Sequence, residues 1–485
     1  MAIFNMFRQK DMPRTYRDDP GVKHLERVLS KWLNSKERQE QLLAEKYYCG
    51  HHDIMERERK VIGADGSLVP IDNIVNNKLV DNQYRKLVDQ KTNYALGKPM
   101  TIAAHDEAYL KVINKIFDKD MHRKIRILAQ YAVDGGIAWL YPFYNEDGEF
   151  DTMVFPAYEI CPIWKDRLHT KLECCIRYYP EEIMNDDGST GVVFHADVFT
   201  VDGVDHYIYD VNTLKPADPA HTEYVYIGDT GYNWERLPMI PFKYNSKEIP
   251  LIRNVKTLQD ALNEAISDFQ NNMQEDPRSS ILILKNYDGT NIPEFRRNLA
   301  TYGVVKVTTV DGVQGGVEAL KVEVNAANYQ AILMQLKRAI VENGRGFDAK
   351  EERMDGDPNQ MNIESMYTDI DLDVNGMEAE FQAGFENLKW FIDQYLIHSN
   401  QGDFTEDEVE FVFNRDIFIN EDAKIESCVK SVGLLSEKTI LSRHPWVTDI
   451  EHELSQIEED TKKELERVAL EQDILAPKES GVNEE

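Results

Sequence analysis

The sequence predicts an α+β protein, and three observations lead to this prediction. Apolar residues recur at helical spacing through much of residues 22–133, and again in residues 362–398 and 420–470. Between residues 137 and 227 the apolar runs are short, aromatic and β-branched, as in antiparallel sheets. Two helical stretches of similar length, 249–275 and 326–344, flank a compact insert. Two helices that leave and re-enter one body resemble a stalk with a cap.

The N-terminal part is predicted to be mainly helical, after a loose polar arm over residues 1–20. The expected helices cover residues 22–46, 73–96 and 105–133. A hairpin is expected between the first and second helices, with its turn at residues 63–66. Gly97-Lys98-Pro99 is predicted to end the second helix and Gly135-Gly136 the third, because glycine and proline favour helix C-termini.

The central part is predicted to be an antiparallel β-rich region with turns at residues 146–148 and 186–188. Its β-like runs cover residues 138–144, 174–179, 192–201, 207–209 and 224–227. Three prolines within residues 237–250 indicate a linker into the first stalk helix.

The insert between the stalk helices is expected to be a small α/β unit. It carries β-like runs at residues 281–284 and 304–310 and a short helix at residues 293–302. After the second stalk helix the polar segment 345–360 contains glycines and Pro358, which indicates an exposed loop. A long helix at 362–398, a strand at 409–413 and charged helices from residue 420 complete the prediction.

The 485 residues carry 86 acidic and 55 basic side chains, a formal net charge of −31. This excess argues against a free basic surface that grips nucleic acid. It fits either a simple requirement for solubility or a surface that repels DNA while guiding it. Five scattered cysteines without a CxxC pair indicate reduced thiols in a cytosolic setting. No signal peptide is predicted, and no apolar run is long enough to span a membrane.

No motif in the sequence predicts catalysis, a metal or a cofactor. Residues 371–376 resemble the start of an EF-hand loop, but Gln382 stands where that loop needs a bidentate carboxylate. His51-His52-Asp53 and His444-Pro445-Trp446 are interpreted as structural turns, because adjacent histidines diverge instead of converging on one ion. The Walker pattern and the GxSxG elbow are both absent from the sequence.

The stalk residues also carry a resemblance to a known family. They include Ile249-Pro250-Leu251, the run Leu258-Gln259-Asp260-Ala261-Leu262-Asn263, Ser267-Asp268 and Asn271-Asn272. Further matching residues are Gly50, His52-Asp53-Ile54, Asn76-Asn77, Asn82, Tyr94 to Pro99, Tyr287 to Thr290, Glu294-Phe295, Asn298-Leu299 and Gly315-Gly316-Val317. In order and spacing, these segments resemble the portal proteins of tailed bacteriophages, of the type found in siphophages of Gram-positive hosts.

The resemblance implies a portal-type fold with five named parts. The expected parts are a mixed α/β wing (1–248 and 362–416), a two-helix stem (249–275 and 326–344), a small α/β clip (276–325), a tunnel loop (345–361), and a helical C-terminal crown with a disordered tail (417–485). It also implies a homo-oligomeric ring, usually a dodecamer and sometimes of thirteen subunits when isolated, around a channel for double-stranded DNA.

Such a ring occupies a unique vertex of the capsid, where DNA is packaged and ejected. The implied partners are the large terminase subunit, a head-completion adaptor protein at the head–tail connector, and the major capsid and scaffolding proteins. The implied location is the virion, after assembly in the host cytoplasm, with no membrane and no enzymatic activity.

The resemblance places the loop after the second stem helix in the narrowest part of the channel. The candidate DNA-channel residues there are Arg345, Lys350, Glu351, Glu352, Arg353, Asp355 and Asn359. Gly344, Gly346 and Gly356 are expected to give the loop freedom to move. Mixed charge suits weak contacts, because strong phosphate contacts would stall a moving duplex. The alternative from the residues alone is a solvated surface loop.

The clip runs are too short to form a self-sufficient sheet. Ile281, Ile283, Val305 and Val307 are therefore the candidate contacts between subunits. Two alternatives to a portal remain from other classes. They are a metal-dependent DNA-processing enzyme of a mobile element and a non-viral structural ring.

Overall fold

The computed structural model describes residues 19–62, 66–70, 75–184, 188–275, 281–285, 316–320, 326–348, 360–415, 421–441, 444–447, 453–457 and 459–463. The chain divides into two compact units. The first comprises residues 1–348 and 369–416, and the second comprises residues 349–368 and 417–485. The mixture of helices and antiparallel strands confirms the predicted α+β class.

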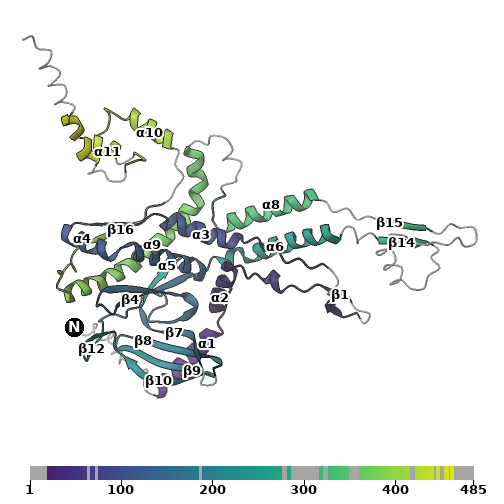
Figure 1. The fold of residues 1–485 in the computed structure, drawn as a ribbon, viewed down its shortest axis with the longest axis horizontal. Helices are drawn as coiled ribbons and strands as arrows, with labels where there is room; N and C mark the ends of the chain where they lie inside the picture. The colour runs from purple at the N-terminus through teal and green to yellow at the C-terminus, as the bar shows by residue number, and fades with distance from the viewer. Residues whose placement is uncertain are drawn as a thin grey trace, which may run out of the picture. The chain divides into compact units, whose positions relative to one another are not determined.

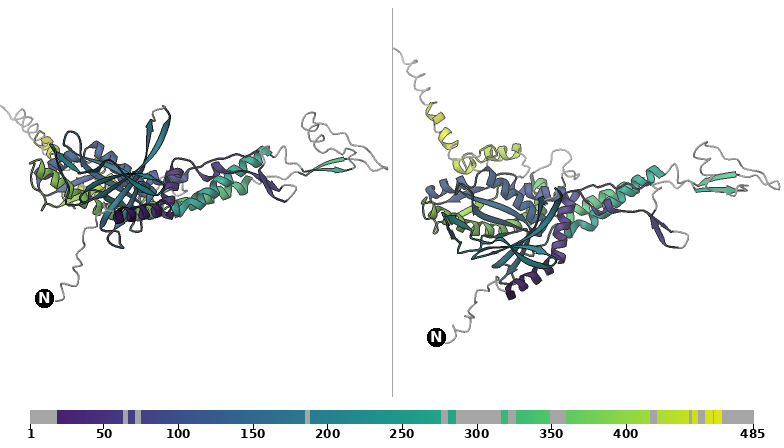
Figure 2. Two further views of the ribbon diagram at one scale, coloured as in Figure 1. Left: turned by 90° about the horizontal axis from the view of Figure 1, so that it is seen from below. Right: turned by 60° about the horizontal axis from the view of Figure 1, so that its bottom comes forward.

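A five-stranded antiparallel sheet with the order β10-β9-β8-β7-β6 lies in the first unit (Figure 1). Its strands are β6 (Ile160–Trp164), β7 (Leu172–Met184), β8 (Thr190–Thr200), β9 (Gly203–Asp210) and β10 (Thr213–Thr222). Helix α1 (Asp19–Leu33) covers one face, where Leu25 and Leu29 pack in a buried core with Ile176 and Val198. Figure 2 (right) shows this dark purple helix lying along the teal strands.

The opposite face of the sheet packs against a second, three-stranded sheet with the order β13-β4-β5. Its strands are β4 (Ile137–Tyr144), β5 (Phe150–Pro156) and β13 (Ile240–Lys243). Trp139 and Phe155 from this sheet are buried with Cys175 and Phe199. Because successive residues of a strand point to opposite faces, Cys175 and Ile176 join the two different cores.

Helices surround these sheets. They are α2 (Lys36–Tyr48), α3 (Gln83–Leu96), α4 (Glu107–Ile116), α5 (Lys119–Gly135) and the long α9 (Gln360–His398). The part of α9 in the first unit buries Phe381 and Phe385 against Phe242 of β13. Phe385 also stacks on Phe411 of β16 (Val409–Val412), which pairs with β3 (Thr101–Ala104). No helix among the described residues is long and apolar enough to cross a membrane.

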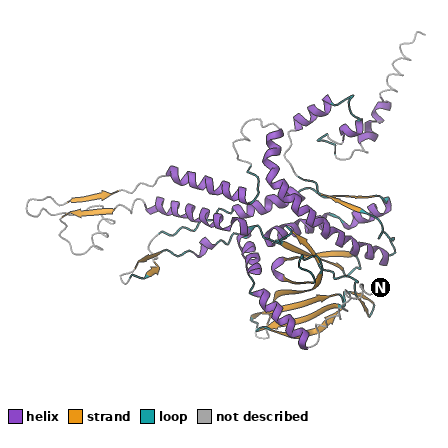
Figure 3. Ribbon diagram, turned by 180° about the vertical axis from the view of Figure 1, so that it is seen from behind, coloured by secondary structure: helices purple, strands orange, loops and turns teal. Residues whose placement is uncertain are grey.

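Helices α6 (Ile252–Glu275) and α8 (Ala326–Asn343) run side by side, as Figures 1 and 3 show. Their bounds agree with the predicted stalk helices to within three residues. The rings of Phe269 and Tyr329 lie 5.0 Å apart between them, and the Asn272 amide donates to the Tyr329 hydroxyl at 3.0 Å.

The predicted strand at 281–284 is confirmed as β14 (Ile281–Lys285). Its antiparallel partner in this chain is β15 (Gly316–Leu320), which the sequence did not predict as a strand. The expected run at 304–310, with Val305 and Val307, and the expected helix at 293–302 lie outside the described residues.

The remaining described elements of the first unit are short. Two are 3₁₀ turns, η2 (Asp53–Glu56) and η3 (Ala157–Glu159). The others form two strand pairs: β1 (Lys60–Ile62) pairs with β2 (Leu68–Pro70), and β11 (Val225–Ile227) pairs with β12 (Thr230–Tyr232). The β1–β2 pair confirms the predicted hairpin.

Three helix predictions were wrong in their bounds. The expected helix at 22–46 is two helices, because Ser35 accepts a hydrogen bond from the Arg38 N–H and caps the start of α2. The expected helix at 105–133 breaks before Asp118, whose side chain caps α5 through the Met121 N–H. The expected helix at 73–96 begins only at Gln83, since the preceding backbone is bound in an extended form to α6, as described below.

The sequence also failed to predict β3, β5, β6, β10 and β12, and β13 lies within residues 237–250, which were predicted to be a linker. Strand β10 contains Pro216 and Pro219, which argue against a strand because proline donates no backbone hydrogen bond. It is tolerated because β10 is an edge strand and its pairing with β9 is interrupted between Pro216 and His221. The Asp218–Pro219 peptide bond is cis.

The described residues of the second unit are mostly helical, with turns at residues 431–435 and 445–446. It contains α10 (Glu421–Lys430) and α11 (Glu437–Leu441), which correspond to two of the helices expected after residue 420. Helical residues 453–457 and 459–463 fall within the third. The expected disordered tail and residues 1–18 of the expected N-terminal arm lie outside the described residues, whereas Asp19 and Pro20 belong to α1.

Candidate functional site

The candidate site lies at the base of α6 and α8, where a ladder of polar side chains joins α6 to an extended segment. Gln259, Asn263, Ser267 and Asn271 are four residues apart on one face of α6, and all four are buried. The side-chain oxygens of Asn271, Ser267 and Asn263 accept hydrogen bonds from the backbone N–H groups of Asn77, Leu79 and Asp81, at 2.7, 2.9 and 3.0 Å.

The fourth rung ends the extended segment and starts a helix. The Gln259 Oε1 accepts from the N–H groups of both Gln83 and Tyr84, each at 3.0 Å. Asn82 caps α3 by accepting from the Arg85 N–H. Four residues of helix rise about 6 Å, close to the length of two strand residues, so the helix side chains match every second backbone N–H of the segment.

The buried His52 contacts the ladder residue Asn263. Its ring nitrogens contact the Asn263 amide at 2.8 Å and the Tyr47 carbonyl at 3.1 Å, and the ring stacks on Tyr47. Burial lowers the pKa of His52, because the charged imidazole would lose its hydration. The neighbouring Asp53 forms an ion pair with Lys256 of α6 at 2.7 Å. The run His51-His52-Asp53 is thus a structural turn, as interpreted from the sequence.

The loop that follows α8 begins with a fixed geometry. The N–H of Gly346 donates to the Val341 carbonyl at 2.8 Å, and Arg345 adopts a left-handed conformation with φ of 48°. This is the pattern by which many helices end. The Arg345 guanidinium is exposed and its Nη1 lies 3.7 Å from the Asp373 carboxylate.

Helix α3 holds the next residues of this loop. The Gln90 amide donates to the Phe347 carbonyl at 2.7 Å and accepts from the Phe347 N–H at 2.9 Å. A Cβ added to Gly344 or Gly346 would come within 2.5 or 2.3 Å of Leu87. The expectation that these two glycines give the loop freedom was therefore wrong, because they permit close packing against α3 instead.

A buried polar cluster lies beneath this segment and joins α3, α8, α9 and the residue after β13. The Lys91 Nζ, fully buried, pairs with the Asp373 carboxylate at 2.5 Å and donates to the Arg345 carbonyl at 3.1 Å. The Tyr244 hydroxyl donates to the same carboxylate. Burial lowers the pKa of Lys91, and the Asp373 carboxylate opposes this shift.

Of the candidate channel residues, the structure describes only Arg345. Arg345 is fixed at the base of the loop, as described above. Lys350, Glu351, Glu352, Arg353, Asp355, Asn359 and Gly356 lie outside the described residues.

The EF-hand-like stretch 371–376 is helical within α9. Asp373 belongs to the Lys91 cluster, and Asp371 accepts from the Tyr94 hydroxyl at 2.9 Å and pairs with Arg415. The backbone therefore follows a helix instead of a calcium-binding loop, which agrees with the interpretation as a charged helical turn. Among the described residues, no group of three or more His, Cys, Asp or Glu side chains has the arrangement of a metal site.

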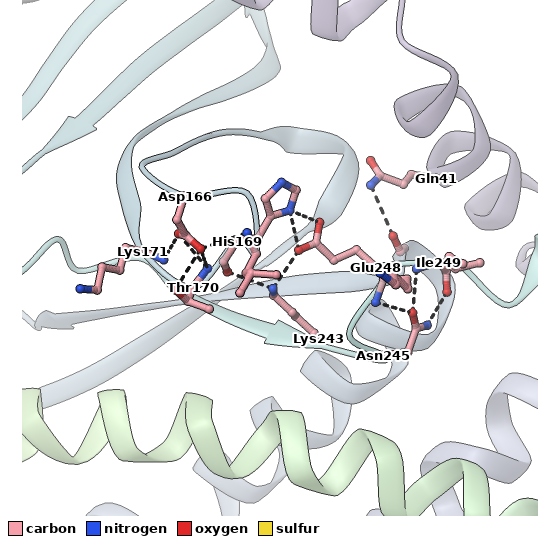
Figure 4. Close-up of polar contacts among 12 residues, drawn as sticks. Gln41, Asp166, His169, Thr170, Lys171, Lys243, Asn245, Glu248 and Ile249 are labelled. Carbon is pink, nitrogen blue, oxygen red and sulfur yellow. Dashed lines mark hydrogen bonds and ion pairs between the residues drawn. The ribbon is translucent and has the colours of Figure 1, made fainter.

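The linker into α6 is fixed by a second polar cluster (Figure 4). The Glu248 carboxylate lies 2.9 Å from both the Lys243 Nζ and the His169 Nδ1. The same Lys243 Nζ donates to the His169 carbonyl at 3.0 Å. Glu248 itself has a φ of 55°, a strained value for a residue with a side chain, and its ion pairs help to hold it there.

Asn245 and Gly136 complete this linker. The Asn245 side chain accepts from the Ile249 N–H at 3.1 Å and donates to the Ile249 carbonyl at 2.8 Å. A Cβ at Gly136 would lie 2.2 Å from the Glu248 carbonyl oxygen, so only glycine lets α5 approach the linker. The direction in which α6 leaves the body is therefore set by side-chain contacts on both sides.

Sequence reasoning missed the ladder as a structural device, although a signal was present. Polar residues at 259, 263, 267 and 271 are spaced by four on a helix that also carries the apolar residues Val255, Leu258, Leu262 and Ile266. A stripe of amide and hydroxyl side chains beside the apolar stripe of the same helix indicates that the polar stripe bonds to another polar segment in the interior. The extended partner could not be located, because residues 73–82 were assigned to a helix.

The chain is similar to known proteins over most of its length. The family described as phage portal protein, SPP1 Gp6-like, matches residues 31–467. The portal protein of Bacillus phage SPP1 is 28% identical over 454 residues, which cover 90% of this chain and 87% of that protein. The portal protein of Clostridium phage phiCD119 is 26% identical over 425 residues, which cover 85% of this chain and 91% of the relative.

Proposed function

Because the chain belongs to the SPP1 Gp6-like family of phage portal proteins, we propose that it forms the ring through which double-stranded DNA enters and leaves the capsid. Membership in this family implies a structural, non-enzymatic component of the capsid that assembles as an oligomeric ring. The observation that carries the proposal is the match over residues 31–467, which includes both α6 and α8 and the segments between them.

The proposed division of labour follows the predicted parts. Residues 1–248 and 362–416 form the wing, 249–275 and 326–344 the stem, 276–325 the clip and 417–485 the crown. The paired helices α6 and α8, joined to the wing by the ladder and the linker cluster, support the assignment of the stem. Rigid joints suit this role, because a channel keeps its width only if each subunit holds its stem at a fixed angle.

The clip would dock first with the large terminase subunit, and later with a head-completion adaptor. The wing and crown would contact the major capsid and scaffolding proteins during assembly in the host cytoplasm. Among the described residues β14 pairs only with β15, so each of these strands would have one edge to offer to a further strand. Contacts of Ile281, Ile283, Val305 and Val307 with adjacent subunits would complete a larger sheet.

The loop 345–361 would line the channel. Gln90, Lys91 and Leu87 hold its first residues at a defined position, so the charges from Lys350 onward extend from a fixed base. With 31 more acidic than basic residues per chain, acidic side chains would also line the bore. Repulsion acts within the Debye length, about 8 Å at physiological salt, and would centre a sliding duplex.

Measuring the mass and activity of the purified chain tests this proposal. The expected result is closed rings of about twelve subunits, usually near half a megadalton or more, with no ATPase or nuclease activity. ATP turnover that co-purifies with the chain through several columns would contradict the non-enzymatic role. A stable monomer at micromolar concentration would contradict the ring.

A further inference from the structure

Helix α1 carries a stripe of exposed cations. Lys23, Arg27 and Lys31 are exposed and four residues apart, so they lie on one face and span about 12 Å. With Ser30, Asn34 and Asn212 of the β9–β10 turn they line an open groove of about 770 Å³. The opposite face of α1 is the one that packs on the sheet, through Leu25 and Leu29.

These cations have no acidic partner of their own. In the part of the chain that the structure describes, none of the three forms an ion pair or a side-chain hydrogen bond. Glu26, the carboxylate in the same groove, accepts a hydrogen bond from the Leu214 N–H at 3.0 Å instead. Basic residues elsewhere in the first unit are paired, for example Arg253 with Glu40 and Lys256 with Asp53 and Asp260.

The groove belongs to a chain that is acidic overall. The chain has 86 acidic and 55 basic residues. The average basic side chain is therefore surrounded by more acidic than basic side chains. Lys23, Arg27 and Lys31 outnumber the one carboxylate of the groove, Glu26, and therefore form a local positive patch on a negative molecule. Such a patch attracts an anionic group from outside the chain.

We propose that the α1 groove binds a carboxylate-bearing surface of a second copy of this chain. The inference rests on the ring proposed above and names one of its subunit contacts. A second copy is negatively charged overall, which supplies the complementary charge. Two α1 stripes facing each other would repel, so the contact joins two different surfaces. Contacts between two different surfaces are the kind that closes into a ring.

Duplex DNA fits this groove less well. A duplex at α1 would have to approach within a Debye length, about 8 Å, of a molecule with a net charge of −31. Three cations would offset only part of that repulsion, since non-specific DNA binding usually depends on more phosphate contacts. A protein surface with a few carboxylates brings less negative charge to the same groove.

Zero-length cross-linking of mixed-isotope rings tests the contact directly. Rings assembled from equal amounts of unlabelled and ¹⁵N-labelled chain are treated with a carbodiimide, which joins amines to carboxylates in contact. We expect peptides of mixed label that join Lys23 or Lys31 to an Asp or Glu of the other copy. Closed rings without such peptides would overturn the α1 contact alone. Failure of the wild-type chain to form rings would instead contradict the proposed function and the contact with it.

Charge reversal gives an independent test. The triple variant Lys23→Glu, Arg27→Glu, Lys31→Glu should stay folded by circular dichroism and lower the fraction of chains in rings roughly tenfold at low salt. The matched control Lys111→Glu, Lys115→Glu, Lys119→Glu changes the net charge equally on exposed positions of α4 and α5. Equal loss of rings in both variants, or rings that persist while only DNA binding falls, would overturn the proposal.

Discussion

At the scale of single residues, four polar side chains of α6 decide where α3 begins. The buried side chains of Gln259, Asn263, Ser267 and Asn271 accept hydrogen bonds from the backbone N–H groups of a partly buried extended segment, which face α6. A buried N–H without an acceptor costs about 1–3 kcal/mol, which exceeds what a continued helix would gain from propensity. The ladder thus replaces helical hydrogen bonds with equivalent ones from another element.

Asn263→Ala tests this ladder. The substitution removes the acceptor for the Asp81 N–H and the contact with His52, so the free energy of unfolding should fall by roughly 1–3 kcal/mol. Hydrogen exchange at the Asp81 amide should accelerate in parallel. Asn254→Ala, at an exposed position on the same helix, is the control and should change neither quantity. Unchanged exchange at Asp81 would refute the ladder.

The charges of the channel loop give a second prediction at this scale. Lys350→Glu with Arg353→Glu should leave rings intact, because the sequence around these two residues has no apolar helical period. The double variant should yield fewer DNA-filled heads, since the loop would lose two of the cations that we propose contact phosphate. The count of filled particles by electron microscopy measures this. Normal filling with normal rings would show that the loop is an ordinary surface segment.

At the scale of elements, His206 joins three strands of the large sheet. Its Nδ1 contacts the Asp197 carboxylate of β8 at 2.7 Å, and its Nε2 contacts the Thr222 hydroxyl of β10 at 2.8 Å. The hydrogen bond to Asp197 raises the pKa of His206 above its ordinary value of 6.5, although burial opposes this. The folded chain therefore binds this proton more tightly than the unfolded chain does.

This raised pKa predicts a pH dependence. The stabilisation by His206 should be complete below pH 6.5 and disappear as the pH rises through the higher folded pKa. The difference in melting temperature between the wild type and His206→Gln should thus be larger at about pH 6 than at about pH 8. Comparing the two chains at the same pH cancels the contributions of other titratable groups, such as His52, to the melting temperature. A difference that grows with rising pH would contradict the assignment.

The clip supplies the second prediction for an element. Charged residues in place of Ile283 and Val305 should give monomers or open arcs, since two short strands need further partners. The wing should remain folded, because Ile283 lies in β14, whose described partner is β15 and not the large sheet. Electron microscopy and circular dichroism of the double variant measure both effects. Closed rings from this variant would show that the clip strands are not subunit contacts.

Sequence patterns predicted elements best where the apolar period was long and uninterrupted. The stalk helices and the 362–398 helix were placed to within a few residues, because their apolar residues repeat over many turns. The predictions failed where a cap or a tertiary contact overrode the local pattern. Asp118 divides one expected helix, and the α6 ladder holds residues 77–81 extended in another. For the candidate site, Arg345 was identified, but its supports Gln90 and Lys91 carried no local signal.

At the scale of the whole molecule, the negative charge and the local positive stripe on α1 would work together. A uniformly acidic chain would repel its own copies, whereas a chain with one positive patch has a preferred contact with its neighbour. Ring formation should therefore weaken as salt rises, because the Debye length shortens from about 10 Å at 0.1 M to about 3 Å at 1 M. Size-exclusion chromatography across this range measures the effect. Rings that become more abundant with salt would indicate apolar contacts alone.

The central claim is that the chain closes into a ring around a channel for DNA. Electron cryomicroscopy of the purified assembly tests it most directly. A closed cyclic ring is expected, with α6 and α8 of each subunit around an axial channel and residues 345–361 facing the bore. The channel should be wide enough for a DNA duplex. Its diameter must therefore exceed the width of the major groove alone, which is roughly 12 Å. A two-fold dimer, an open filament or a ring whose axis is filled by protein would contradict the claim.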